Sequence, residues 1–250
     1  MFFYYNVVFM VKGEINNKNI ISELTEIFGY KSNNLENQNI INRGFVSAKL
    51  KKAKALFVGI NPSYLSNATN ESYLYDIENA VLEYPKHYRK FTELVTNTKY
   101  ENDWSYIDLF QFRETNQKKI YDFYKNDVEF IVSQLKLTHK IICEINPEII
   151  VVCNSGASDF FGINKIKKSE YWENIWLGYE FEYNKNFGID IIKGIHNESI
   201  IKDQKQHLKN LPILFTSTLT YKSRFDKKRL NWQLNLVAEN YNRNEKNNCG

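Results

Sequence analysis

An asparagine and a proline stand directly after an apolar segment in the first third of the chain. The segment Ala53 to Ile60 is rich in β-branched and other apolar residues, and it leads through Gly59 into Asn61, Pro62 and Ser63. Because proline cannot continue a central strand, the backbone must turn out of the sheet here. The Asn61 amide carries donors and an acceptor in one plane, so it can hold a water molecule or a polar ligand. A strand-ending turn with a capping asparagine would leave the same pattern.

Hydroxyl and basic side chains follow a second apolar run, Pro212 to Phe215, late in the chain. These candidate ligand-binding residues are Thr216, Ser217, Thr218, Leu219, Lys222 and Arg224. Hydroxyls and cations suit contact with phosphates, and an exposed leucine could act as an apolar wedge. The alternatives are a helix cap for the hydroxyls, a solvated face for the cations and a core position for the leucine.

Other candidates follow the remaining apolar runs. Asn154 stands after one of them and could bind a ligand edge through its amide, or it could cap a helix that starts next to it. Tyr64 and Phe110 could offer an aromatic face to a ligand, although aromatic residues are common in this chain and any one of them can be core. Asp108 and Arg113 could shape a pocket or form an ion pair.

The elements that must position these residues alternate along the chain. Short β-branched runs predict strands, and amphipathic stretches between them predict helices. The predicted strands are Ala53 to Ile60, Trp104 to Phe112, Glu148 to Cys153 and Pro212 to Phe215. The predicted helices are Ile77 to Thr96, Asp127 to Glu144, one opening at Gly156 to Phe161, and Asp226 to Tyr241. Trp176 to Tyr183 and Ile189 to Ile195 predict an added antiparallel hairpin.

This alternation predicts an α/β fold, a three-layer sandwich with a central, mostly parallel four-stranded sheet, helices on both faces and the added β-hairpin. Ligands bind at the carboxyl ends of such strands, where the candidates above should meet. One domain is expected over residues 46–241, with an extension, 1–45, packed on its core and a flexible tail, 242–250. Met1 to Val11 is interpreted as an edge strand or as leader residues before Met10.

The segment Gly59 to Ser63 (Gly-Ile-Asn-Pro-Ser) resembles the catalytic motif of mismatch-specific enzymes in the uracil-DNA glycosylase superfamily. The resemblance covers about Lys54 to Val237. Members carry a second motif after the last core strand, often His-Pro-Ser or Asn-Pro-Ser, and the matching place here is Thr216 to Thr220. Neither histidine nor proline stands there, so a histidine that stabilises the departing base has no direct counterpart.

The resemblance implies a monofunctional glycosylase that flips a base, with uracil as the first candidate, out of DNA and hydrolyses its N-glycosidic bond. It assigns catalysis to Asn61 and Ser217, and base binding to Gly59, Ile60 and Ser63 together with Tyr64, Phe110 and Asn154. DNA contact falls to Thr216, Thr218, Leu219, Lys222 and Arg224. Two alternatives stay open. One is a glycosylase for modified pyrimidines of phage DNA, and the other is an inactive relative that binds DNA or a protein.

Composition excludes little more. A formal net charge of +4 permits contact with phosphates but does not require it. The three cysteines and four histidines lack metal-ligand spacing, so neither a metal nor another cofactor is expected. The cysteine usage favours a reducing cytoplasm, no segment predicts a membrane span, and a monomer is expected.

Overall fold

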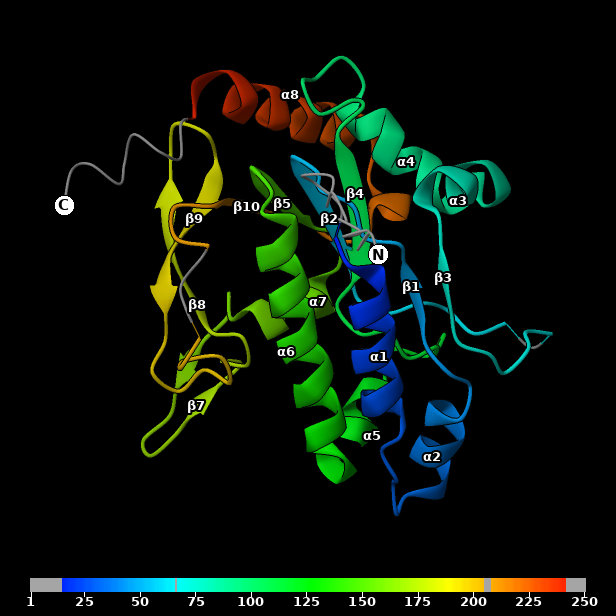
Figure 1. Cartoon of the computed structure of the whole chain (residues 1–250). Coiled ribbons are helices and arrows are strands. Elements are labelled where there is room, and N and C mark those ends of the chain that lie inside the picture. Colours follow the sequence, from blue (N-terminus) through cyan, green and yellow to red (C-terminus); the bar gives the residue numbers. More distant parts are fainter. Residues whose placement is uncertain (1–14, 66, 205–207, 242–250) are drawn as a thin grey trace, which may run out of the picture.

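The apolar runs predicted as strands assemble into one mixed sheet. We describe residues 15–65, 67–204 and 208–241 of a computed structural model (Figure 1). The sheet holds six strands, in the spatial order β4 (Trp104–Asp108), β2 (Ala55–Gly59), β5 (Ile149–Val152), β10 (Pro212–Phe215), β9 (Ile189–Ile195) and β8 (Tyr179–Asn184). The first four are parallel to one another, and the last two are antiparallel to their neighbours.

The predicted number of four strands is corrected to six. The hairpin β8–β9 was expected as an addition to the four strands, and it extends the same sheet, because β9 pairs with β10, with Pro212 opposite Ile191. The free edge of β10 is thereby covered, which removes a row of unpaired backbone groups.

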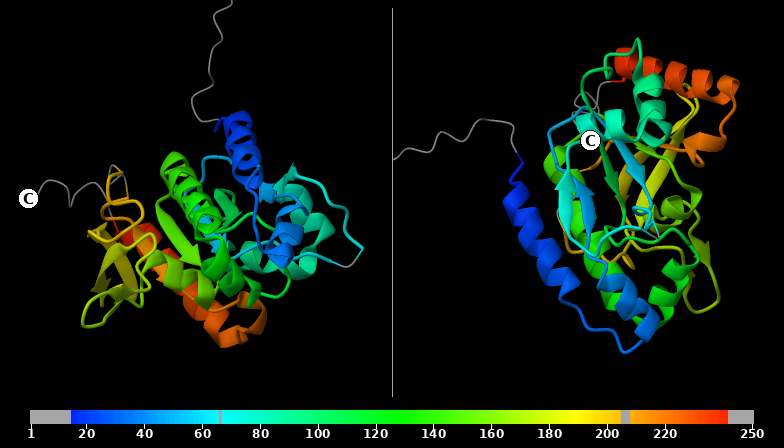
Figure 2. Two further views of the ribbon diagram at one scale, coloured as in Figure 1. Left: turned by 90° about the horizontal axis from the view of Figure 1, so that it is seen from below. Right: turned by 90° about the vertical axis from the view of Figure 1, so that its right-hand side faces the viewer.

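Helices contribute to apolar clusters on both faces of the sheet. Leu56 and Val58 of β2 belong to a core cluster that includes side chains of α1 (Asn17–Phe28) and α6 (Val128–Ile145). Ala55 and Phe57 point the other way, into a cluster with α4 (Pro85–Val95) and α8 (Arg224–Asn240). The left view of Figure 2 shows α1 and α6 on one side of the strands and α8 on the other. Alternation along the strand therefore fills two cores.

The remaining elements of the described residues are short. They are α2 (Leu35–Ile41), α3 (Ile77–Glu83), α5 (Lys119–Asn126), α7 (Ser155–Phe161), the 3₁₀ turn η1 (Leu219–Tyr221), and the strands β1 (Val46–Ala48), β3 (Tyr73–Tyr75), β6 (Ile166–Lys167) and β7 (Trp172–Glu173).

Two predicted boundaries shift. The helix expected from Ile77 to Thr96 is divided into α3 and α4, because Tyr84 leaves the helical region and Pro85 starts a new first turn. The second strand ends at Asp108 and not at Phe112, although the Phe110 N–H still donates to the Ile60 carbonyl at 2.9 Å.

Residues 15–45 pack on the same core. The ring of Phe28 lies 5.3 Å from that of Phe130 in α6 and 5.5 Å from that of Phe45. The interpretations of Met1 to Val11 and of the tail 242–250 concern segments outside the described residues. Within 15–65, 67–204 and 208–241, no helix is both long enough and apolar enough to cross a membrane.

Candidate active site at the carboxyl edge of the sheet

The parallel strands end level with one another, so their following loops share one edge. Gly59 at the end of β2 pairs with Asp108 at the end of β4. On the other side, Val152 of β5 pairs with both Val58 and Phe215. Four loops that are far apart in the sequence therefore leave the sheet at the same level, as predicted for an α/β sheet.

Asn61 and Ser217 both belong to this edge. They follow β2 and β10, which are separated only by β5, so the two strand ends lie about 10 Å apart. Asn61 is half-buried and Ser217 is exposed. The two segments that carry the resemblance to a glycosylase thus emerge on the same side of the molecule.

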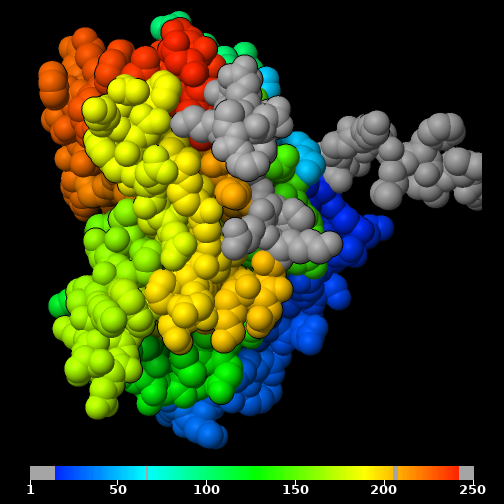
Figure 3. Space-filling model, turned by 90° about the vertical axis from the view of Figure 1, so that its left-hand side faces the viewer, coloured from blue at the N-terminus to red at the C-terminus, as the bar shows by residue number. Residues whose placement is uncertain are grey.

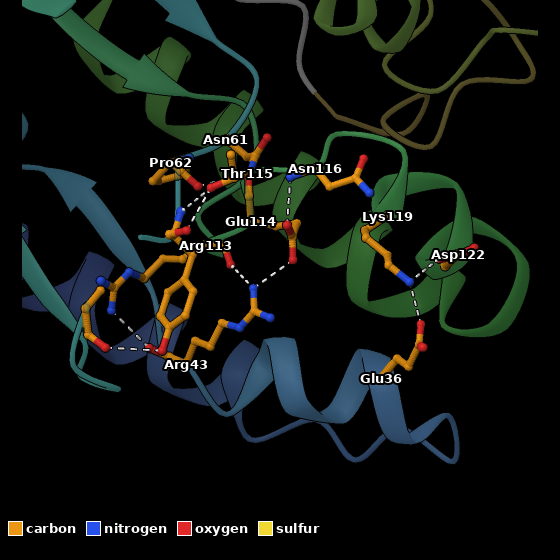
Figure 4. Close-up of polar contacts among 12 residues, drawn as sticks. Glu36, Arg43, Asn61, Pro62, Arg113, Glu114, Thr115, Asn116, Lys119 and Asp122 are labelled. Carbon is orange, nitrogen blue, oxygen red and sulfur yellow. Dashed lines mark hydrogen bonds and ion pairs between the residues drawn. The ribbon is translucent and has the colours of Figure 1, made fainter. Parts of the chain in front are cut away.

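The amide of Asn61 is held in one orientation. Its Nδ2 donates to the Glu114 carbonyl at 2.6 Å and to the Pro62 carbonyl at 3.0 Å (Figure 4). Its Oδ1 is buried, and no described residue donates to it. Since an unsatisfied buried acceptor is costly, a water molecule or a ligand is the natural partner for this oxygen.

The loop that orients Asn61 is itself fixed by an ion pair. Arg43 donates from Nη1 to the Glu114 carboxylate at 2.7 Å and to the Arg113 carbonyl at 3.0 Å. The Glu114 N–H donates to the Pro62 carbonyl at 2.9 Å. Figure 4 shows this chain of contacts running from Arg43 to Asn61. The asparagine is thus supported from the loop after β4 and from the segment before β1.

Tyr64 lies on the same support. The guanidinium carbon of Arg43 is 4.3 Å from the centre of the Tyr64 ring, and that of Arg113 is 5.1 Å from it. The Tyr64 hydroxyl donates to Asn70 Oδ1 at 2.8 Å. Tyr64 therefore binds cations through its ring in this structure, and Arg113 donates to backbone carbonyls instead of pairing with Asp108.

The segment after β10 differs in part from expectation. Thr216 is 8% exposed, and its Oγ1 is buried without a hydrogen-bond partner among the described residues. Leu219 is 1% exposed and packs in the core cluster of α4 and α8, so it does not protrude as a wedge here. Thr218 and Lys222 are half-buried, and Arg224 is exposed.

An exposed aromatic ring stands close to Leu219 in the sequence. Tyr221, in the same 3₁₀ turn, is 88% exposed. The segment after β10 therefore presents a large apolar side chain to solvent, but through a residue that the sequence did not single out.

Asn154 caps a helix. Its Oδ1 accepts from the Gly156 N–H at 2.8 Å and from the Ala157 N–H at 3.2 Å, which starts α7. The acceptor half of the amide is therefore occupied. Only the Nδ2 donor remains for a ligand. Asn154 could therefore donate to an acceptor on a ligand, but it could not offer its amide donor and acceptor side by side.

The remaining predicted base-binding residues lie in different environments. Ile60 is buried and Ser63 is exposed. Phe110 is fully buried, with its ring 5.6 Å from that of Phe112 and 4.9 Å from that of Phe160. Phe110 therefore belongs to the core and offers no open ring in this structure.

A buried carboxyl group lies beside these loops. Asp108 is 6% exposed and accepts a hydrogen bond from the Tyr106 hydroxyl at 2.7 Å. Burial raises the pKa of Asp108 to about 7, and the Tyr106 hydrogen bond opposes that rise. Burial also raises the pKa of Tyr88 and Tyr75, whose hydroxyls lie 2.8 Å apart near this carboxyl. Asp108 is thus a carboxyl group at a strand end with a pKa near neutrality.

The side chains of Tyr106 and Asp108 fill the space beside Gly59, which has no side chain of its own. A Cβ at position 59 would lie 2.1 Å from the Tyr106 hydroxyl oxygen and 2.3 Å from Asp108 Oδ1. Gly59 was expected to contact a base, but the structure already requires glycine here because a side chain would collide with Tyr106 and Asp108.

A buried lysine contacts the segment after β10. Lys90 of α4 is 8% exposed, and its Nζ donates to Thr220 Oγ1 at 2.7 Å. Burial lowers the pKa of Lys90. This contact ties η1 to α4, and it places a cation on the same face of the sheet as Asp108 and Cys153.

The described residues outside this edge include one surface hollow and one small cavity. Among residues 15–65, 67–204 and 208–241, no three His, Cys, Asp or Glu side chains are grouped so that they could hold a metal. A surface hollow of about 800 Å³ lies between α1 and α6, and a small cavity of about 10 Å³ lies beside His139 and Tyr179. Neither touches the carboxyl edge.

Comparison with known proteins adds no family. No model of a protein family matches the sequence, and no curated protein matches it either. The function of this chain is therefore inferred from the geometry of this edge.

Sequence reasoning missed three supports of the site. Arg43, Glu114 and Lys90 act through contacts with segments more than 50 residues away. A polar pair directly after a predicted strand was a weak signal for Glu114. No pattern distinguishes Lys90 from the other lysines of an amphipathic helix.

Proposed function

We propose that this protein is a monofunctional DNA glycosylase, with uracil as the first candidate base. The proposal takes the sheet and its two helical layers as the three-layer sandwich of the uracil-DNA glycosylase superfamily. DNA is the proposed partner, and the carboxyl edge that carries Asn61 and Ser217 is the proposed active site.

One observation carries the proposal. Asn61 has an oriented amide whose Nδ2 is engaged twice and whose Oδ1 is buried without a protein partner. An acceptor held in this way can orient a water molecule through a hydrogen bond. Since positioning a nucleophile supplies a large part of an enzymatic barrier reduction, this is the feature that hydrolysis needs most.

The proposed reaction needs few groups. The oxygen of the water attacks the C1′ atom of the deoxyribose, the C1′–N bond breaks, and its electron pair leaves with the base. The water releases a proton, and the base or solvent accepts one. An amide cannot accept that proton, so Asn61 positions the water and does not act as a general base. We therefore expect slow turnover.

The site also constrains the base. Because the Oδ1 of Asn154 accepts two backbone N–H groups of α7, only its Nδ2 can contact a ligand. The proposal therefore assigns to Asn154 a single hydrogen bond to a carbonyl oxygen of the base. Uracil carries such oxygens on its exposed edge.

The segment after β10 supplies the proposed contacts with DNA. Lys222 and Arg224 would meet phosphates, and Thr216 would donate its hydroxyl to the ligand. Tyr221 replaces Leu219 as the proposed wedge, because the tyrosine ring is 88% exposed and the leucine is 1% exposed. Unstacking a base costs a few kcal/mol, which an inserted ring can offset.

Incubation with defined oligonucleotides tests the proposal. Single strands and duplexes that contain uracil, hypoxanthine, xanthine or hydroxymethylcytosine are treated with the protein and then with alkali, which breaks strands at abasic sites. Breaks at uracil support the proposal. Breaks at hydroxymethylcytosine alone would shift the substrate to modified pyrimidines, and an intact strand in every case would refute glycosylase activity.

A matched pair of variants tests the role of Asn61. Asn61→Ala should remove cleavage and leave the helical content unchanged. Asn79→Ala, at an exposed position of α3, is the control and should cleave like the unmodified protein. Full activity of Asn61→Ala would exclude the proposed water-positioning role.

A further inference from the structure

Two exposed aromatic rings stand on the outer face of the last helix. In α8, the side chain of Phe225 is 77% exposed and that of Trp232 is 58% exposed. The helix lies on the surface beside the β8–β9 hairpin, as the orange and yellow regions of Figure 3 show. Large apolar side chains with this exposure contribute little to folding.

The two rings share one side of the helix, and that side faces away from the core. Seven residues separate Phe225 from Trp232, so the rings differ by about 20° around the axis and about 10 Å along it. The buried residues Leu230, Leu234 and Val237 lie on the opposite side. The aromatic positions are therefore not required by packing.

Basic residues flank Phe225 in the sequence. Between Lys222 and Arg229 the chain carries five basic residues and one acidic residue, Asp226. The carboxylate of Asp226 accepts from the Ser223 hydroxyl at 2.7 Å at the start of the helix. Five positive charges and one negative charge give this eight-residue segment a net charge of +4, which equals the net charge of the whole chain.

We infer that the outer face of α8 binds single-stranded nucleic acid. Bases stack on Phe225 and Trp232, and the cations of the segment from Lys222 to Arg229 meet the phosphates. Exposed aromatic rings interleaved with basic side chains are the usual construction of such surfaces. A protein partner of acidic character would not require two rings on one line of the helix, and a second copy of this chain would bring like charges together.

The position of the helix connects this surface to the proposed active site. The helix α8 follows η1 directly, and η1 follows the segment of Thr216 and Ser217 at the carboxyl edge. A strand bound along α8 would thus lead toward the segment of Thr216 and Ser217. The inference extends the proposed function by naming the form of the nucleic acid, but the binding itself does not depend on base excision.

Fluorescence anisotropy with labelled oligonucleotides tests the inference. The full chain is titrated into oligothymidylate, oligouridylate and a mixed-sequence duplex at low salt. We expect binding to the single strands, with affinity that falls as salt rises. Replacement of each ring, Phe225→Ala or Trp232→Ala, should weaken binding by about fivefold to a hundredfold. Trp232→Phe should restore most of the affinity, because a ring is kept.

A ring elsewhere on the surface serves as the control. Tyr121 in α5 is 63% exposed, and Tyr121→Ala should leave affinity unchanged. Unchanged affinity in the Phe225→Ala, Trp232→Ala double variant would overturn the inference. So would tighter binding to the duplex than to either single strand, or a dimer that the double variant disrupts without any effect on oligonucleotides.

The two proposals fail separately. Asn61→Ala should bind oligothymidylate like the unmodified chain while it loses cleavage. Normal single-strand binding without excision of any base would refute the glycosylase and leave the α8 surface standing. Excision that is unaffected by loss of both rings and of single-strand affinity would refute only the connection between them.

Discussion

The hydroxyl of Tyr106 donates a 2.7 Å hydrogen bond to Asp108, and the two atoms occupy the space where a side chain at Gly59 would lie. The two residues alternate with Ile107 along β4, so both face the core cluster of α4 and α8. A buried carboxyl, a phenol and a glycine on the neighbouring strand therefore form one unit. Gly59, the member of this unit on β2, lies two residues before Asn61 in the chain.

Gly59→Ala should destabilise the fold. The new methyl group would lie 2.1 Å from the Tyr106 oxygen, so the Tyr106–Asp108 pair must move apart. We expect a loss of about 1–3 kcal/mol in the free energy of unfolding, measured in urea. Gly194→Ala is the control, because its Cβ meets only the carboxylate end of Glu180, at 2.9 Å. Equal losses in both variants would contradict the close contact described here.

The titration of Asp108 should appear as a pH dependence of stability. Its pKa is about 7 in the folded protein against an ordinary value of 3.8, so between these values the folded state holds a proton that the unfolded state has released. The folded state binds more protons there, and this contribution to stability is present below about pH 4 and is lost as the pH rises to about 7. The difference corresponds to roughly 4 kcal/mol.

Asp108→Asn isolates this effect. The amide resembles the protonated carboxyl in shape, and its oxygen can still accept from Tyr106. The difference in unfolding free energy between variant and unmodified protein should therefore grow in favour of the variant between pH 4.5 and pH 7, values within the range that the raised pKa of Asp108 defines. A difference that is constant over this range would show that Asp108 titrates normally.

Arg43→Ala should cost more stability than loss of an exposed ion pair. Arg43 contacts the Glu114 carboxylate, the Arg113 carbonyl and the Tyr64 ring. We expect a loss of about 1–3 kcal/mol, since a partly buried charged group loses its hydrogen-bonded partner. Lys49→Ala, which breaks an exposed pair with Asp76, should cost less than about 1 kcal/mol. Urea unfolding of the two variants in the same buffer measures both losses of unfolding free energy. Equal losses would contradict the supporting role of Arg43.

Thr216→Val separates stability from binding. The Oγ1 of Thr216 is buried without a partner, so its removal should leave stability unchanged or raise it by about 1 kcal/mol. If the hydroxyl contacts the ligand, cleavage or oligonucleotide binding should fall in the same variant. Ser105→Ala removes another unpartnered buried hydroxyl, within β4, and should affect stability alone. Unimpaired activity in Thr216→Val would remove this residue from the proposed site.

Much of the scaffold could be predicted because its strands are buried on both faces. Runs such as Ile149–Val152 are apolar at every position, and this is possible only where helices cover both sides of a sheet. The hairpin was also evident from its alternation. Its attachment to β10 was not, because backbone pairing between strands leaves no local signal in either sequence.

The helices of residues 15–45 were not predicted individually. Their stability comes from contacts such as Phe28 with Phe130, which are about 100 residues apart. Residues 15–45 are rich in asparagine, which favours caps and turns over helix interiors, so the local sequence does not favour a helix over a polar extension.

By itself, the sequence determined that Asn61 and Ser217 would follow parallel strands, because apolar runs and a proline turn are local features of the chain. Only the tertiary structure decided what these positions offer. Glu114 turns the Asn61 oxygen away from the protein carbonyls, the core takes Leu219 and Phe110, and α8 turns Phe225 and Trp232 outward. Side-chain orientation and burial depend on neighbours that are distant in the chain, and so they are decided only when the chain has packed.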